Sequence, residues 1–242
     1  MKDMPNESVH LTFTSPPYYN ARSYAHWDNY GTYLDFIESV FNEVHRITME
    51  GRFLVINTSP IIEPRIDRAH MSKRYAIPFD IHSKITKIGW DFIDDILWVK
   101  PEPSVKNRNG NFSSIRNPLS YKPNSITEYL MVYRKHTDKL IDWNIKKYSN
   151  DIKDRSKVPD GYESSNVWYI SPKASKFHPA IFPEELCDKV IRYYSYETDI
   201  ILDTFMGIGT TGLVAQNLHR DFIGMELDEN YFEIAKQRII NS

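Results

Sequence analysis

Three glycines and one glutamate form the part of this sequence best suited to hold a small ligand. The glycines come after the apolar run Ile200–Leu202 and have the spacing G-x-G-x-x-G, at Gly207, Gly209 and Gly212. A glycine turn between a strand and a helix brings bare backbone N–H groups and a helix N-terminus close to a ligand. Glu226 follows Gly207 by nineteen positions, where a carboxylate can accept hydrogen bonds from both hydroxyls of a ribose. The pattern predicts a pocket for an adenosine-containing ligand.

The tetrapeptide Ser15-Pro16-Pro17-Tyr18 offers a second kind of chemistry. Two prolines directly after a strand cannot continue its hydrogen-bond ladder, so the chain must turn outward at the carboxyl end of that strand. In an open parallel sheet this edge is where ligands bind. A planar base with an amino group can stack on Tyr18, while Ser15 and the Pro16 carbonyl hold its N–H groups. The amine can then attack an electrophilic methyl group directly. The alternative is that the proline pair forms only a turn.

Alternating strands and helices must position these two groups. Apolar runs and their bounding turn residues predict strands over residues 9–14, 52–57, 90–99, 125–133, 200–203 and 222–226. Helical spacing and capping residues predict helices over residues 33–49, 78–88, 183–194, 210–218 and 229–240. Segment 59–75 is expected to be a loop, and segment 134–176 has little periodicity. The alternation predicts a single α/β domain over residues 1–242 with a doubly wound, mostly parallel sheet. The glycine strand is fifth in sequence, which implies a permuted strand order.

The charge of the chain is unevenly distributed. The net charge is −2 overall, but residues 100–157 contain 13 Lys and Arg against 6 Asp and Glu, a net charge of +7. A basic middle in an acidic chain indicates a surface that faces a polyanion, with an ordinary solvated face as the alternative. Within the proline-, asparagine- and serine-rich segment 101–123, four cations are predicted to contact nucleic acid: Lys106, Arg108, Arg116 and Lys122.

Composition excludes several other classes of protein. The single cysteine, Cys187, rules out a disulfide framework and a multi-cysteine metal site. The eight histidines include no close pair at helical spacing, so no metal site is predicted. The sequence has neither a signal peptide nor an apolar run of about twenty residues. We therefore expect a soluble, cytoplasmic protein without a membrane partner.

Four segments together resemble the β-group amino DNA methyltransferases. They read TSPPY at residues 14–18, HPAIFPEEL at 178–186, LDTFMGIGTTG at 202–212 and RDFIGMELDENYFEIAKQRI at 220–239. In this family the catalytic half comes first and the S-adenosyl-L-methionine half last, and the resemblance covers nearly the whole chain. It implies a Rossmann-like class I methyltransferase fold, circularly permuted.

The resemblance also implies roles for individual residues. The catalytic tetrapeptide would be Ser15, Pro16, Pro17 and Tyr18. Serine at its first position is found mostly in N4-cytosine enzymes, and aspartate in N6-adenine enzymes. The residues implied to bind S-adenosyl-L-methionine are Asp203, Phe205, Gly207, Gly209, Thr210 and Thr211 around the methionine part, Glu226 at the ribose, and His178, Pro179 and Phe182 closing over the cofactor.

The implied function is site-specific methylation of the N4 amine of cytosine in double-stranded DNA, by base flipping and direct attack. Such enzymes work in restriction–modification systems beside a cognate restriction endonuclease, and homodimers are one expected state. Segments 101–123 and 137–176 are candidate DNA-contact or target-recognition insertions. One alternative is an N6-adenine enzyme. Another is a catalytically silent DNA-binding remnant, because relatives carry a glycine–aspartate strand ahead of the segment where this sequence begins. A C5-cytosine enzyme needs an activated cysteine in a loop, which the helical Cys187 does not provide.

Overall fold

The structure, a computed structural model, describes residues 1–20, 26–63, 67, 69–70, 72–105, 118–119, 121, 123–173 and 182–241. Within these residues one large sheet is built from seven strands: β1 (Val9–Thr14), β2 (Thr48–Thr58), β5 (Trp90–Val99), β6 (Thr127–Lys135), β7 (Val167–Tyr169), β8 (Ile200–Asp203) and β9 (Asp221–Gly224). Their order across the sheet is β7-β5-β6-β2-β1-β8-β9. Only β6 runs antiparallel to its neighbours. The mostly parallel, doubly wound sheet predicted from the sequence is confirmed.

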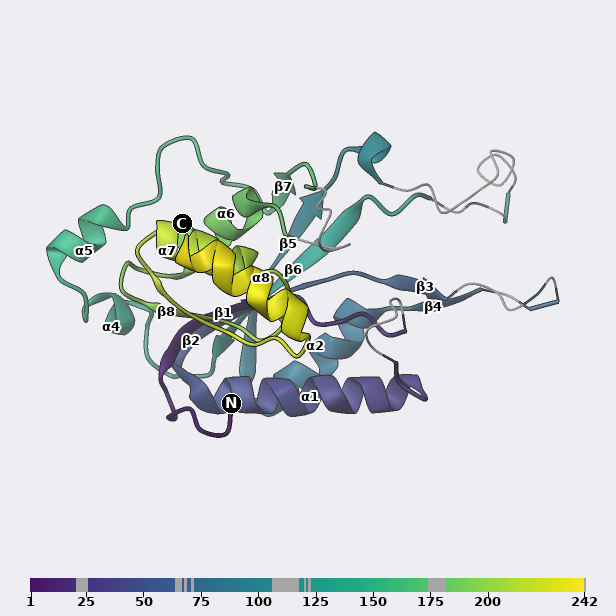
Figure 1. Ribbon diagram of the computed structural model, residues 1–242, viewed down its shortest axis with the longest axis horizontal. Coiled ribbons are helices and arrows are strands. Elements are labelled where there is room, and N and C mark those ends of the chain that lie inside the picture. The colour runs from purple at the N-terminus through teal and green to yellow at the C-terminus, as the bar shows by residue number, and fades with distance from the viewer. Residues whose placement is uncertain are drawn as a thin grey trace.

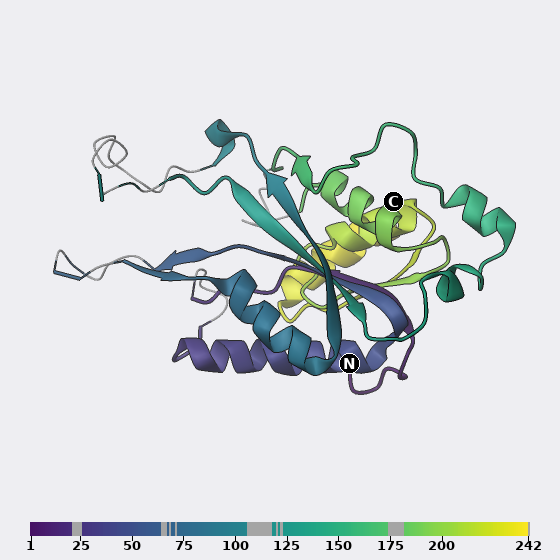
Figure 2. The same ribbon diagram turned by 180° about the vertical axis from the view of Figure 1, so that it is seen from behind.

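Helices cover both faces of this sheet (Figures 1 and 2). On one face lie α1 (Tyr30–Ile47) and α2 (Ile77–Ile88), and on the other lie α6 (Glu184–Tyr194), α7 (Thr210–Asn217) and α8 (Glu229–Ile240). Helix α1 buries Tyr33, Ile37, Phe41 and Val44, a spacing of three and four residues that gives one apolar stripe toward the sheet. None of the described helices is long and apolar enough to cross a membrane.

The predicted elements agree best with the structure where the sequence pattern is long or alternates strictly. The strands predicted over 9–14 and 90–99 and the helix predicted over 229–240 have the observed bounds. The expectation of a loop over 59–75 is wrong in part, because β3 (Ile61–Glu63) and β4 (Lys73–Tyr75) pair there as a hairpin. Segment 134–176, which has little periodicity, contains α4 (Asp142–Ile145), α5 (Asn150–Arg155) and β7. Strands of three residues and helices of four and six residues are too short to show a period.

Strands β1 and β8 lie side by side although they come from opposite ends of the chain. They pair in parallel, with Leu11 opposite Ile201 and Thr12 opposite Leu202. The first and the fifth strand predicted from the sequence are therefore neighbours in the sheet, which is the permuted order expected from the sequence. Their carboxyl ends, which lead into the tetrapeptide and into the glycine turn, reach the same edge.

Helices α4 and α5 pack at the opposite end of the strands, around the amino ends of β2 and β8. Asn144 Nδ2 donates to the Gly51 carbonyl at 3.2 Å, and Arg155 pairs with Glu197 at 2.7 Å. The Tyr148 hydroxyl donates to the buried Asp199 carboxylate. Much of the candidate insertion 137–176 is thus fixed to the amino end of the sheet. Its predicted contact with DNA stays a prediction.

Candidate active site

The tetrapeptide Ser15–Tyr18 and the Gly207–Gly209 turn meet where β1 and β8 end. Thr14, the last residue of β1, donates its hydroxyl to Asp203 Oδ1 at 2.7 Å across 189 positions of sequence. Ser15 follows Thr14 directly, and the glycine turn follows Asp203. The tetrapeptide and the glycine turn therefore leave the sheet side by side, at the edge where open parallel sheets bind ligands.

The Asp203 carboxylate is almost completely buried, with 1% of the residue exposed. Besides Thr14, Oδ1 accepts the Phe205 backbone N–H at 3.1 Å, and Oδ2 accepts the Thr211 hydroxyl at 2.8 Å. Burial raises the pKa of Asp203 to about 6, because desolvation of the charged form outweighs these hydrogen bonds. Both oxygens are occupied by protein groups.

The glycine turn has the backbone conformation that a ligand-binding turn requires. Gly207 and Gly209 have φ angles of 53° and 75°, which L-residues with a side chain rarely adopt. Gly209 is also the N-cap of α7, so the turn presents backbone N–H groups and the start of an eight-residue helix. Glu226 fixes the turn, because its Oε2 accepts the Gly207 N–H at 2.9 Å. Its Oε1 accepts the N–H groups of Leu227 and Asp228, each at 2.9 Å.

The third glycine of the motif serves packing. A Cβ placed on Gly212 would lie 2.5 Å from the Phe222 ring and 2.6 Å from Ile239. Only a glycine therefore allows α7 to lie this close to β9 and α8. Next to it, the Thr210 hydroxyl lies 3.3 Å from Arg238 Nη1 of α8.

The tetrapeptide contacts Glu128, which is paired with Lys100, and neither residue was predicted as part of the site. The Tyr18 hydroxyl lies 3.4 Å from Glu128 Oε2. Burial and the nearby Glu128 raise the pKa of Tyr18 well above its usual value. Glu128, near the start of β6, pairs with Lys100, whose ammonium lies 4.4 Å from the centre of the Trp98 ring.

The signal for this pair in the sequence is weak. Lys100 and Glu128 lie outside the four segments that carry the family resemblance, and each stands at a strand end. Because β6 runs antiparallel, its beginning lies at the same edge as the end of β5. Only this topology brings Glu128 and Lys100 to Tyr18.

A comparison of the sequence with known protein families supports the same kind of site. The profile of the DNA methylase family, the N6/N4 methyltransferases, matches residues 9–237. The chain belongs to the DNA methylase family.

Relatives and solved structures agree with this assignment. The methylase is 27% identical to the Type II beta methyltransferase M.BslI of Bacillus sp. (strain NEB-606), over 99% of this chain but only 26% of that protein. It is 29% identical to the Type II methyltransferase M.ScaI of Streptomyces caespitosus, over 99% of this chain and 77% of that protein. A putative DNA modification methylase of Thermus thermophilus, TTHA0409, solved in complex with S-adenosyl-L-methionine, superposes with a TM-score of 0.80 at 27% identity. That alignment covers 99% of this chain and 88% of TTHA0409.

The methylase has the class I methyltransferase fold, and its cofactor is S-adenosyl-L-methionine. The residues present fit that group: the Gly207–Gly209 turn gives a side-chain-free approach to the start of α7, and Glu226 places a carboxylate beside it. A carboxylate oxygen has two lone pairs. Oε1 already accepts two backbone N–H groups and Oε2 accepts one, so Glu226 can hold the turn and accept one of the two ribose hydroxyls.

Other predicted residues of the methylase lie outside the described residues or in packed positions. His178, Pro179, Lys106, Arg108, Arg116 and Lys122 lie outside the described residues. The Phe182 ring stacks on Phe13 of β1, with 4.7 Å between ring centres and 15° between planes. Cys187 is fully buried in α6, and burial raises the pKa of its thiol well above its usual value. Among the described residues no group of three His, Cys, Asp or Glu side chains could hold a metal ion.

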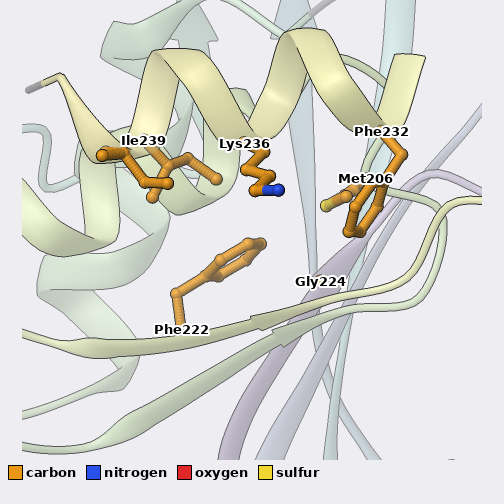
Figure 3. Close-up of a pocket in the computed structure, with 7 residues that line it drawn as sticks. Met206, Phe222, Gly224, Phe232, Lys236 and Ile239 are labelled. Carbon is orange, nitrogen blue, oxygen red and sulfur yellow. The ribbon is translucent and has the colours of Figure 1, made fainter. Parts of the chain in front are cut away.

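An apolar groove lies beside the cofactor half of the methylase. It runs along α8 at β9, the last strand of the sheet, and Figure 3 shows Phe222 and Met206 opposite Phe232, Lys236 and Ile239. Polar groups that converge on one point are absent from its lining, which is carbon-rich except for Lys236 and the Met206 sulfur. Ligand sites normally combine apolar walls with a few placed polar groups. The groove is therefore not the candidate active site.

Proposed function

We propose that the methylase transfers the methyl group of S-adenosyl-L-methionine to the N4 amine of cytosine in double-stranded DNA. The observation that carries this proposal is the 2.7 Å hydrogen bond from Thr14 to Asp203. It supports a common site, because the tetrapeptide and the glycine turn then begin at adjacent strand ends. Ser15 at the first position of the tetrapeptide favours cytosine over adenine.

In the proposed mechanism the chain holds the target amine and excludes alternative poses. The target base is flipped out of the duplex, which costs a few kcal/mol of lost stacking, and its ring lies against Tyr18. Ser15 and the Pro16 carbonyl accept the N–H groups of the amine and draw its lone pair out of conjugation with the ring. When bound, S-adenosyl-L-methionine supplies an electrophilic methyl group. No covalent intermediate between enzyme and base is needed.

The relatives suggest the biological setting. M.ScaI and M.BslI are named as Type II methyltransferases, a class that works in restriction–modification systems. We propose the same setting here, with double-stranded DNA as the direct partner. A cognate restriction endonuclease would be a functional partner through the shared recognition sequence.

Mass spectrometry of nucleosides tests the reaction and the base together. DNA is isolated from cells that express the methylase, from cells that express a Tyr18→Ala variant and from cells with an empty vector. We expect N4-methylcytosine with the unaltered chain, less of it with the Tyr18→Ala variant, and none with the empty vector. N6-methyladenine in its place would show that the runner-up specificity is correct. The absence of both methylated bases would contradict the proposal.

Calorimetric titration with S-adenosyl-L-methionine distinguishes an enzyme from a DNA-binding remnant. An enzyme must bind the cofactor, whereas a remnant with an impaired pocket binds DNA alone. We expect saturable binding by the purified chain. DNA binding without any cofactor binding would favour the remnant.

A further inference from the structure

The Asp203 carboxylate joins three segments of the site: the end of β1, the cofactor turn and the start of α7. Its Oδ1 holds Thr14 at 2.7 Å, immediately before the tetrapeptide, and the Phe205 N–H at 3.1 Å, inside the cofactor turn. Its Oδ2 holds Thr211 at 2.8 Å, in the first turn of α7. The Thr14 hydroxyl accepts a further hydrogen bond from Thr204 at 3.3 Å.

This arrangement differs from the role that the family resemblance implies. A residue that shapes the methionine pocket would direct at least part of its side chain toward the ligand. Here 1% of Asp203 is exposed, and each carboxylate oxygen accepts protein donors. The three donors all come from segments that must be held relative to one another for methyl transfer.

We propose that Asp203 is a positioning residue, which acts through Thr14 to fix the catalytic tetrapeptide against the cofactor turn. The proposal rests on the proposed function, in which Ser15 to Tyr18 hold the target amine. Hydrogen bonds to a buried carboxylate are shorter and stronger than neutral ones, so they restrain both partners. Reacting atoms must stand about 3–3.5 Å apart, and a misplacement of about 1 Å can reduce the rate about a hundredfold.

The same strand provides a matched control. Thr12 lies two residues before Thr14 and on the same face of β1, since side chains alternate along a strand. It is equally buried, but its hydroxyl finds no hydrogen-bond partner among the described residues. Thr12→Val and Thr14→Val therefore both remove a buried hydroxyl from the same strand. Only Thr14→Val also removes the hydrogen bond to Asp203.

The experiment compares Thr14→Val, Thr14→Ser, Asp203→Asn and Thr12→Val with the unaltered methylase. Three quantities are measured: affinity for S-adenosyl-L-methionine by calorimetry, thermal stability, and the single-turnover rate of labelled methyl transfer to unmethylated bacterial genomic DNA. Genomic DNA is used because it contains most short recognition sequences.

We expect Thr14→Val to slow single-turnover transfer by about tenfold to a hundredfold, with cofactor affinity changed by less than about threefold. Thr14→Ser keeps the hydroxyl and should recover most of the rate, and Thr12→Val should transfer at the normal rate. In the double variant Thr14→Val with Asp203→Asn, the two losses should add less than fully. Asp203→Asn weakens the acceptor of the Thr14 hydroxyl by removing its charge, and Thr14→Val removes the donor of the same hydrogen bond.

Two results would overturn the proposal. One is a Thr14→Val variant that loses only thermal stability and transfers methyl groups at the normal rate well below its Tm. The other is a double variant whose losses add in full. A failure of the proposed function looks different, since the unaltered chain would then methylate adenine or transfer no methyl group to DNA.

Discussion

At the scale of single residues, Tyr18 contributes a ring and a hydroxyl, and the two are expected to differ in importance. Tyr18→Ala should lose about 1–3 kcal/mol of base stacking, and kcat/KM for methyl transfer should fall accordingly. Tyr18→Phe keeps the ring and loses the 3.4 Å contact with Glu128, so it should retain much of the activity. Steady-state kinetics on DNA measure both. A phenylalanine variant as inactive as the alanine variant would mean that the hydroxyl is the essential group.

Glu226 should dominate recognition of the ribose. Glu226→Ala removes a charge-assisted hydrogen bond to a ribose hydroxyl, on the order of 1.5–3 kcal/mol of binding free energy. It also removes the acceptor of the Gly207 N–H. Glu226→Gln keeps one carbonyl oxygen as acceptor and should lose less. Calorimetry measures the affinity for S-adenosyl-L-methionine, and an unchanged affinity in a folded alanine variant would refute the assignment.

Asp203 should make the stability of the methylase depend on pH. Its pKa is raised from 3.8 to about 6 in the folded state, so the folded state binds the proton more tightly than the unfolded state. The contribution of Asp203 to the free energy of unfolding is fully present below about pH 4. This contribution, about 3 kcal/mol in total, is lost as the pH rises through about 6. In Asp203→Asn this loss should disappear. Unfolding by urea across this pH range measures the difference, and parallel curves for the two proteins would contradict the prediction.

At the scale of elements, α6 presents Cys187 to the core and not to the site. The thiol is fully buried and its pKa is raised, so it is a poor nucleophile at neutral pH. Cys187→Ser should keep methyl transfer and lose about 1–3 kcal/mol of folding free energy, because a hydroxyl is placed in an apolar environment. Thermal unfolding and methyl transfer are measured together. Loss of transfer, with a denaturation-resistant protein–DNA adduct in the unaltered chain, would instead indicate methylation at carbon 5.

At the scale of the whole molecule, the basic middle of the sequence divides between two edges of the sheet. Segment 101–123 leaves β5 and enters β6 at the carboxyl edge, whereas α4 and α5 pack at the amino edge. Two sets of four cations can therefore be compared: Lys106, Arg108, Arg116 and Lys122 in the first segment, and Lys139, Lys146, Lys147 and Lys153 in the second.

Neutralising the first set should flatten the dependence of DNA affinity on salt. Each lost phosphate contact lowers the slope of log affinity against log salt by about 0.9, so four contacts would change it by about 3–4. Neutralising the second set should leave the slope unaltered. Filter binding or fluorescence anisotropy at several salt concentrations measures both. An unchanged slope for the first set would show that segment 101–123 faces solvent, and a change for the second set would locate DNA contacts in segment 137–176.

The sequence by itself determined the elements with long or distinctive patterns. The strand 90–99 and the helix 229–240 follow from runs of ten and twelve residues, long enough for local propensity and periodicity to decide. The Gly207–Gly209 turn follows from backbone conformations that favour glycine. The order of catalytic and cofactor halves was also readable, because the motifs are contiguous.

Only the tertiary structure decided which side chains meet. Thr14 and Asp203 are 189 positions apart, and no local pattern states that β1 lies next to β8. The Lys100–Glu128 pair at Tyr18 depends on the reversed direction of β6. The three-residue strand β7 is held by its pairing with β5. Contacts of this kind depend on how the strands pack across the sheet. The free energy of this packing comes from several distant segments together, so the sequence of one segment does not predict it.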